Sequence, residues 1–295
     1  MASSGSGTWT VRTALDWIVG YLTRKEDEHP RLSAEWLLSD ATGLSRVELY
    51  AYFDRPLDAS ELAHLHDGVL RRGRGEPLQY VCGEVAFRHI ILRAQRGVLI
   101  PRPETEMLVE EGLVAVDAAL ADRGECQVLD LCTGSGNIAL SILSERDGVH
   151  AVATDISPLA MKLATRNASA LGLEKRIELI GCDLAEGVPA DRWGTFDLVI
   201  SNPPYIPTDE LRNLPREVGD FEPVLALDGG RDGLDVFRRI VEVAPDLLRP
   251  GGMLVCELHE ETLQAAARLC EGYYEDVSVV RDLTGRERFI RAIRV

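Results

Sequence analysis

Four consecutive residues, Asn202-Pro203-Pro204-Tyr205, combine groups suited to a planar nitrogen with a rigid backbone. They follow an apolar run, residues 196–201, that predicts a buried parallel strand. Because two prolines cannot extend a central strand, we expect a sharp turn at its carboxyl end, where open α/β sheets bind ligands. An asparagine amide donates and accepts hydrogen bonds, and a tyrosine ring packs on flat groups. The motif therefore suits an amide or an exocyclic amine as the reacting centre.

A second candidate site lies upstream, where a predicted strand runs into a glycine-rich turn and then a helix. Such a turn lets the backbone approach a ligand closely, and the amino end of a helix favours negative groups. The turn lacks the third glycine of the dinucleotide fingerprint and the Gly-Lys-Ser/Thr of a P-loop, and an ordinary tight loop is the structural alternative. The candidate cofactor-binding residues here are Asp130, Cys132, Thr133, Gly134, Ser135 and Gly136.

The ends of the next two predicted strands carry carboxylates suited to a nucleoside. Asp155 ends one strand, 21 residues after Gly134, where a carboxylate can accept both hydroxyls of a ribose. Asp183 follows the next strand, where it can meet an adenine amino group while Leu184 covers the ring. The structural alternatives are a helix N-cap for Asp155 and a turn for Asp183. The ordered set favours a cofactor site, to which we also assign Ile156.

The order of these motifs resembles that of the class I S-adenosylmethionine-dependent methyltransferases. More closely, the chain resembles the protein-(glutamine-N5) methyltransferases that modify peptide-chain release factors, the PrmC/HemK family. Asn-Pro-Pro-Tyr alone is shared with DNA and RNA amino-methyltransferases, whereas Gly-Glu-Pro-Leu-Gln-Tyr combined with Ile-Pro-Arg-Pro-Glu-Thr-Glu is much more specific. The segments that carry the resemblance are Gly75–Tyr80, Leu99–Glu106, Asp130–Gly136, Ser201–Pro207, Phe221–Pro223 and Asp228–Leu234.

The resemblance implies a Rossmann-like α/β fold, with a mostly parallel seven-stranded sheet and a small N-terminal helical domain. It implies S-adenosyl-L-methionine as the cofactor and release factors as protein partners. The implied reaction methylates N5 of the glutamine in a Gly-Gly-Gln motif and so modulates translation termination. The Asn202 side-chain oxygen and the Pro203 carbonyl are expected to accept hydrogen bonds from the glutamine NH2. Tyr205 is expected to pack on the amide plane after the turn that Pro204 fixes.

The chain departs from the family pattern at three places. Cys132 stands where the family usually has glycine, although its backbone amide can serve equally. Leu184 replaces an aromatic residue that covers the adenine in some members, which weakens stacking. Cys256-Glu257-Leu258-His259 stands where Glu-Ile-Gly is usual, which raises a metal or thiol site as an alternative. Because the six cysteines form neither a Cys-x-x-Cys pair nor zinc spacing, we expect no metal.

Arg102, Glu104 and Thr105 belong to a matching segment, but their roles stay open. They are expected near the methionine end of the cofactor or in the linker. The structural alternative is that Pro101-Arg102-Pro103 simply fixes a turn before an acidic helix start.

The formal charge of −16 bears on the class of substrate. Residues 1–75 hold 9 Lys and Arg against 11 Asp and Glu, so most of the negative charge lies in the rest of the chain. Domains that grip nucleic acid usually show a basic surface, so direct nucleic-acid binding is not expected. Arg71, Arg72 and Arg74 form either a local basic patch or a favourable helix end.

Two other functions stay open as alternatives. One is methylation of N6 of adenine, or of another exocyclic amine, on DNA or RNA, against which the acidity and the family-like segments argue. The other is a catalytically silent cofactor-binding or adaptor protein, against which the intact Asn-Pro-Pro-Tyr motif argues.

Composition indicates a cytoplasmic enzyme without a membrane partner. No apolar run approaches membrane-spanning length, and the six scattered cysteines are typical of reduced thiols. Met1–Gly7 lacks the apolar core of a signal peptide and is expected to form a flexible tail.

The pattern of apolar residues divides the chain into three parts. Residues 1–75 show helical spacing and are expected to form a substrate-recognition domain. Residues 76–95 are expected to form a β-hairpin linker, and residues 96–295 alternate strands and helices as the methyltransferase domain. Apolar positions of the first part that are expected to pack in a core include Leu15, Ile18, Leu32, Trp36, Leu37, Leu65 and Val69.

Overall fold

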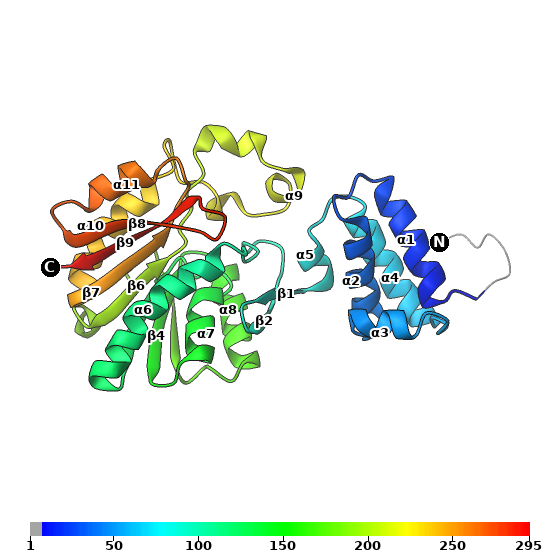
Figure 1. The fold of residues 1–295 in the computed structure, drawn as a ribbon, viewed down its shortest axis with the longest axis horizontal. Coiled ribbons are helices and arrows are strands. Elements are labelled where there is room, and N and C mark those ends of the chain that lie inside the picture. Colours follow the sequence, from blue (N-terminus) through cyan, green and yellow to red (C-terminus); the bar gives the residue numbers. More distant parts are fainter. Residues whose placement is uncertain (1–7) are drawn as a thin grey trace. The chain divides into compact units, whose positions relative to one another are not determined.

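The computed structural model describes residues 8–295, which form two compact units (Figure 1). One unit runs up to Glu84 and also includes Pro215–Phe221, and the other comprises Val85–Leu214 and Glu222–Val295. We call them the helical unit and the methyltransferase unit. The assignment of distinct roles to separate domains stays a prediction, and the tail predicted at residues 1–7 lies outside the described residues.

The helical unit is built from short helices with strong end signals. A capping box at Thr10 begins the first helix, and Asp58 accepts backbone hydrogen bonds from Ser60 and Glu61 at the start of the fourth. Gly43 ends the second helix in the left-handed conformation, at φ 68°. The helices are α1 (Val11–Thr23), α2 (Pro30–Thr42), α3 (Arg46–Ala51), α4 (Ala59–Arg72), α5 (Leu78–Cys82) and the short α9 (Arg216–Gly219).

The core of the helical unit confirms most of the predicted apolar faces. Leu15, Ile18 and Leu65 are buried in one cluster. The predicted burial of Leu32 and Trp36 is wrong, since 39% and 42% of their surfaces are exposed. The core instead receives another face of α2, whose buried apolar residues are Ala34, Leu37 and Leu38.

The arginine cluster at the end of α4 is largely occupied by ion pairs. Arg72 is buried, and it pairs with Asp27 at 2.6 Å and with Glu217 at 2.7 Å. Arg71 pairs with Glu76 at 2.8 Å. These two arginines hold the helical unit together, which argues against an exposed basic patch at these two positions. The pair with Glu217 also joins Pro215–Phe221 to this unit.

The methyltransferase unit contains the predicted mostly parallel seven-stranded sheet. The strand order is β5-β4-β3-β6-β7-β9-β8, and β9 is antiparallel to both of its neighbours. The strands are β3 (Cys126–Leu131), β4 (Val149–Asp155), β5 (Ile177–Gly181), β6 (Phe196–Ser201), β7 (Leu248–Glu257), β8 (Tyr274–Arg281) and β9 (Glu287–Arg294). A separate hairpin joins β1 (Glu84–Phe87) and β2 (Ile90–Arg93), whereas residues 78–82 of the predicted linker form α5.

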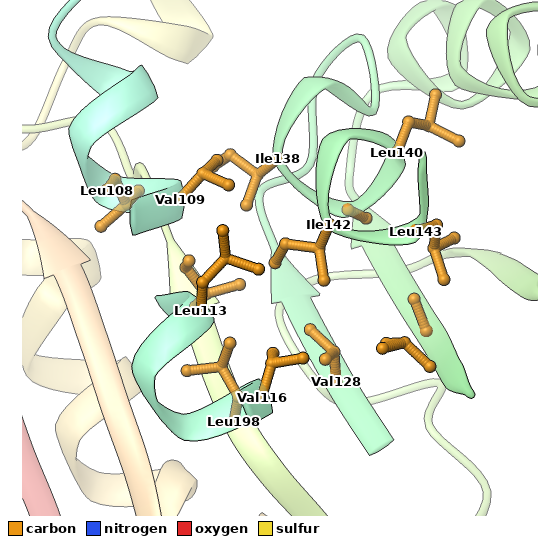
Figure 2. Close-up of a cluster of buried hydrophobic side chains, with 14 of the residues drawn as sticks. Leu108, Val109, Leu113, Val116, Val128, Ile138, Leu140, Ile142, Leu143 and Leu198 are labelled. Carbon is orange, nitrogen blue, oxygen red and sulfur yellow. The ribbon is translucent and has the colours of Figure 1, made fainter. Parts of the chain in front are cut away.

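Helices cover both faces of this sheet because its central strands are apolar on both sides. Figure 2 shows one face, where side chains of α6 (Thr105–Arg123) and α7 (Asn137–Glu145) pack with Val128 and Leu198. The helix α8 (Pro158–Ala170) contributes Ala168 to the same cluster. In a second buried cluster, side chains of α10 (Asp235–Leu247) and α11 (Leu263–Cys270) pack against strand residues, such as Leu129 and Leu131, that alternate with those of the first cluster. The remaining short helices are η1 (Ala190–Arg192), η2 (Thr208–Asn213) and η3 (Val224–Ala226).

The strand order places the two sequence motifs side by side. The chain proceeds from β3 to β4 and β5 in one direction, and then returns to the other side of β3 with β6. Leu131 and Ser201 are register partners at the carboxyl ends of β3 and β6, and the Ser201 hydroxyl donates to the Leu131 carbonyl at 2.7 Å. Ligands of such sheets bind at this reversal point. In the described part of the chain, no helix is long and apolar enough to cross a membrane.

Candidate active site

A cavity of about 220 Å³ opens at the carboxyl ends of the central strands. In the described part of the chain, every residue that lines it belongs to the methyltransferase unit. Ten of the residues predicted for the site are brought together here: Cys132, Thr133, Gly134, Ser135, Asp155, Ile156, Asp183, Leu184, Asn202 and Pro204. Asp130, Gly136, Pro203 and Tyr205 are not part of this lining.

The glycine-rich turn wraps one side of the cavity with left-handed backbone. Cys132 has φ 60° and Gly134 has φ 57°. This conformation is costly for a residue with a Cβ atom, which gives a physical reason for the glycine that the family usually has at position 132. A Cβ atom added at Gly134 would meet no other atom within 4 Å, so glycine leaves the cavity open there. The turn therefore fits close approach of a ligand.

Asp130 supports the turn from beneath. It is fully buried, and its Oδ2 accepts hydrogen bonds from the Thr133 hydroxyl at 2.6 Å and from the Ala139 backbone N–H at 3.2 Å. Burial raises the pKa of Asp130 to about 7. The carboxyl therefore joins the turn to the first residues of α7, while direct contact with a cofactor stays a prediction.

Asp155 lies on the cavity wall and is also engaged by the backbone. Its Oδ2 accepts from the Gly134 N–H at 2.8 Å, and its Oδ1 accepts from the Ser157 N–H at 2.8 Å. Ser157, rather than Asp155, is the N-cap of α8. Burial raises the pKa of Asp155 against these two hydrogen bonds. Since each carboxylate oxygen accepts more than one hydrogen bond, both can still receive a hydroxyl, and Ile156 lines the cavity beside them.

The third strand end supplies a carboxylate and an apolar cover. Asp183 and Leu184 both line the cavity, and Leu184 adopts a left-handed φ of 46°. Asp183 pairs with Arg239 at 3.0 Å, and Arg239 lies on the cavity wall as well. The sequence did not suggest this arginine, which comes from the distant helix α10. An adenine amino group at Asp183 would share the carboxylate with it.

Asn202 is held by a chain of side-chain hydrogen bonds that leads to the buried Glu257. Its Nδ2 donates to the Thr105 hydroxyl at 3.0 Å, and that hydroxyl donates to Glu257 Oε2 at 2.8 Å. The Tyr205 hydroxyl lies 3.3 Å from Glu257 Oε1 and donates to it. Burial raises the pKa of Glu257 to about 7, although Thr105, Arg288 and Tyr205 oppose the rise. Tyr205 thus anchors its own loop, and its predicted packing on a substrate amide gains no support from the cavity lining.

A second glycine-rich segment, Asp228–Leu234, packs against the backbone of Pro204 and Tyr205. The Gly229 N–H donates to the Ile206 carbonyl at 2.8 Å, and the Ile206 N–H donates to the Leu227 carbonyl at 2.9 Å. A Cβ atom on Gly229 would lie 2.7 Å from the Tyr205 Cα atom and 2.8 Å from the Pro204 carbonyl oxygen. The absence of a side chain therefore permits this close approach.

The segment between β2 and α6 closes another side of the cavity. Arg102 pairs with the buried Glu222 at 2.7 Å, and the Ile100 N–H donates to the same carboxylate at 3.3 Å. Both Arg102 and Thr105 line the cavity, whereas Glu104 is the residue that precedes α6. Arg102 and Thr105 are thus part of the site, and Glu222 explains why the Phe-Glu-Pro motif accompanies them.

The six cysteines are free thiols. Among residues 8–295, no group of three or more His, Cys, Asp or Glu side chains is arranged to hold a metal ion.

The comparisons with known proteins agree with this geometry. Residues 13–83 match the PrmC N-terminal domain, and residues 111–213 match the methyltransferase small domain. The release factor glutamine methyltransferase of Geobacter sulfurreducens is 46% identical over 250 residues, which cover 85% of this chain and 84% of that protein. The release factor glutamine methyltransferase of Rhodopirellula baltica is 38% identical and covers 98% of both chains. The chain belongs to the release factor glutamine methyltransferase family.

Membership of this methyltransferase family confirms the predicted enzyme class and its S-adenosylmethionine dependence. The wall of the cavity fits that cofactor, because it combines an open glycine turn, a carboxylate for hydroxyl groups and apolar side chains. The solved hMettl16 catalytic domain with MAT2A 3′UTR hairpin 6 has a TM-score of 0.52, at 15% identity, over 79% of this chain and 81% of that chain. That similarity shows the shared fold.

Several parts of the methyltransferase site were missed from the sequence. Glu257 was noted only as a departure from a motif, Glu222 only as part of one, and Arg239 not at all. Thr105 was noted without a role. The short matching segments around Thr105 and Glu222 were the available signals, whereas Arg239 sits in an ordinary amphipathic helix and gave none.

Proposed function

We propose that this protein transfers a methyl group from S-adenosylmethionine to the side-chain amide nitrogen, N5, of the glutamine in the Gly-Gly-Gln motif of peptide-chain release factors. The observation that carries the proposal is the position of Asn202 directly after the carboxyl end of β6, on the wall of the same cavity as Asp155. Family membership supplies the substrate class, since the relatives are named for release factor glutamine.

The wall of the cavity suggests how the cofactor is held. Asp155 accepts the ribose hydroxyls, Leu184 covers the adenine, and the backbone of Cys132 to Gly134 faces the methionine part. Bound there, S-adenosylmethionine would supply an electrophilic methyl group on a sulfonium sulfur, whose bond to that methyl group breaks as the nitrogen attacks, with S-adenosyl-L-homocysteine as the product. The residues of the site then have to align and desolvate the substrate amide.

An amide nitrogen is a poor nucleophile because its lone pair is delocalised into the carbonyl group. Asn202 Oδ1 and the Pro203 carbonyl oxygen accept the two N–H groups of the glutamine side chain and hold the nitrogen in line with the methyl group. Alignment of this kind lowers a barrier by roughly 7–11 kcal/mol in favourable cases. The nitrogen is neutral when it attacks, so its proton can leave afterwards and no strong base is needed at the start.

We also propose that the helical unit recognises the release factor. The cavity is lined by the methyltransferase unit, which leaves the helical unit free for another task. The matching PrmC N-terminal domain spans nearly the same residues, 13–83. The enzyme would then act in the cytoplasm, where release factors work.

One assay tests the proposed substrate directly. The protein is incubated with S-adenosylmethionine labelled in the methyl group, together with either a release factor or nucleic acid, and the labelled product is digested and mapped. We expect label on the glutamine of Gly-Gly-Gln in the release factor. Label on a nucleic-acid base, with none on the release factor, would contradict the proposal.

A further inference from the structure

When Glu257 is ionised, the hydrogen-bond chain that ends at Asn202 has a fixed direction. Thr105 Oγ1 lies 2.8 Å from Glu257 Oε2 and 3.0 Å from Asn202 Nδ2. A carboxylate can only accept, and a threonine hydroxyl has a single proton to donate. The Thr105 proton is therefore used on Glu257, and the side of the hydroxyl oxygen that faces Asn202 can only accept.

We propose that Thr105 and Glu257 are positioning residues that fix which way the Asn202 amide faces, so that its nitrogen is held inside and its oxygen is presented to the substrate amide. The inference rests on the proposed function, because the presented oxygen matters only for a substrate that brings an N–H group to it.

The reversed orientation of the Asn202 amide would be penalised twice. Its oxygen would face the Thr105 oxygen with no proton between them. Its NH2 group would face the NH2 group of the substrate, where two donors meet. Thr105 and Glu257 are each only 1% exposed, so water cannot easily satisfy either group instead.

The three residues come from separate elements, which makes the chain a built feature of the fold. Thr105 begins α6, Asn202 follows β6, and Glu257 ends the neighbouring strand β7. Thr105 lies 97 positions from Asn202 and 152 positions from Glu257 along the chain. Tyr205 directs a second hydroxyl at Glu257, and burial raises the pKa of that tyrosine, so it stays a donor.

The test compares full-length variants at about pH 8.5, where a carboxyl with a pKa near 7 is ionised. Thr105→Val removes the hydroxyl at similar volume, and Thr105→Ser keeps it. We expect Thr105→Val to lower single-turnover transfer to a saturating release factor on the order of tenfold or more. Thr105→Ser should restore most of the rate, and cofactor affinity should change by less than about threefold in both variants.

Two combinations separate positioning from loss of packing. In an Asn202→Ala background, Thr105→Val should have no further effect on the rate, because the oriented amide is already absent. Glu257→Gln should slow transfer as Thr105→Val does. A variant that carries both Thr105→Val and Glu257→Gln should transfer no more slowly than the slower of the two single variants. As a matched control, Thr154→Val removes another buried hydroxyl, one without a hydrogen-bond partner, and should leave transfer unchanged.

Near-normal transfer by Thr105→Val, or an equal further loss in the Asn202→Ala background, would overturn the inference. These outcomes are distinct from failure of the proposed function, which would appear as no transfer to the release factor by the unmodified protein. If the unmodified protein then methylates another amine, the same set of variants is compared on that substrate, where the same losses are expected.

Discussion

Gly134 donates its backbone N–H to Asp155 Oδ2 at 2.8 Å, which ties the glycine-rich turn after β3 to the end of β4. The Ser157 backbone N–H donates to the other carboxylate oxygen, Asp155 Oδ1, also at 2.8 Å. One side chain thus sets the shape of two strand ends and still faces the cavity. Asp155 can therefore both hold the glycine-rich turn and bind the ribose hydroxyls, and an experiment has to separate these two roles.

Asp155→Ala should weaken S-adenosylmethionine binding by roughly tenfold or more. Hydrogen bonds to a charged group contribute roughly 1.5–3 kcal/mol each, and every 1.4 kcal/mol is about tenfold in affinity. The measurement is titration calorimetry, with thermal unfolding as the check on folding. Asp147→Ala is a suitable control, because that side chain is fully exposed. Unchanged affinity in folded Asp155→Ala would reject the ribose assignment.

Gly229→Ala should impair transfer more than it impairs cofactor binding. The new methyl group would lie 2.7 Å from the Tyr205 Cα atom, so the loop that carries Asn202 has to move. Displacement of this kind can cost on the order of 100-fold in rate. Single-turnover transfer and calorimetry measure the two quantities separately.

The matched control for Gly229 is Gly20→Ala, within α1. Its nearest neighbour to an added Cβ atom is the Arg24 Nη1 atom at 3.5 Å, which is ordinary contact. Alanine should stabilise that helix by about 0.5–1 kcal/mol and leave transfer unchanged. Equal transfer rates in Gly229→Ala and Gly20→Ala would show that the close approach at Tyr205 is unimportant.

Asp130 should make stability depend on pH in a defined direction. Its pKa is about 7 in the folded chain against an ordinary value of 3.8, so the folded state holds the proton more tightly. This contribution favours folding below about pH 4 and is lost as the pH rises through about 7. Asp130→Asn cannot titrate, so its free energy of unfolding should fall less than that of the unmodified protein over this range. Chemical unfolding at several pH values measures it, and parallel curves for the two proteins would contradict the prediction.

Much of the site was predictable because strand ends are easy to find. Short apolar runs followed by glycine, aspartate or proline marked the ends of β3, β4, β5 and β6. Parallel strands bring their carboxyl ends to one edge, so residues such as Gly134 and Asp155 had to be close.

The side-chain partners were not predictable, because they depend on how helices dock on the sheet. Nothing in the local sequence around Asn202 indicates Thr105, which is 97 residues away. The pairing of Asp183 with Arg239 depends in the same way on the placement of α10. The burial of α2 was misjudged at Trp36 because apolar residues occupy more of that helix than its core face needs.

Removal of residues 1–84, which include all of the helical unit except Pro215–Phe221, should separate cofactor binding from substrate recognition. A chain that begins at Val85 keeps the sheet, both of its core clusters and the whole cavity lining. We expect it to bind S-adenosylmethionine with near-normal affinity, which also reports its folding, and to lose most activity on a whole release factor. Full activity with a normal KM would show that the helical unit is dispensable.

The central claim concerns Asn202, and single-turnover methyl transfer to a saturating release factor tests it most directly. Asn202→Ala removes both amide functions, and Asn202→Asp keeps an acceptor but adds a charge and loses the donor to Thr105. Both variants should stay folded and bind S-adenosylmethionine within a modest factor by calorimetry. Transfer should fall on the order of 100-fold or more, as for loss of one preorganised polar contact. Near-normal transfer by Asn202→Ala would contradict the proposed mechanism.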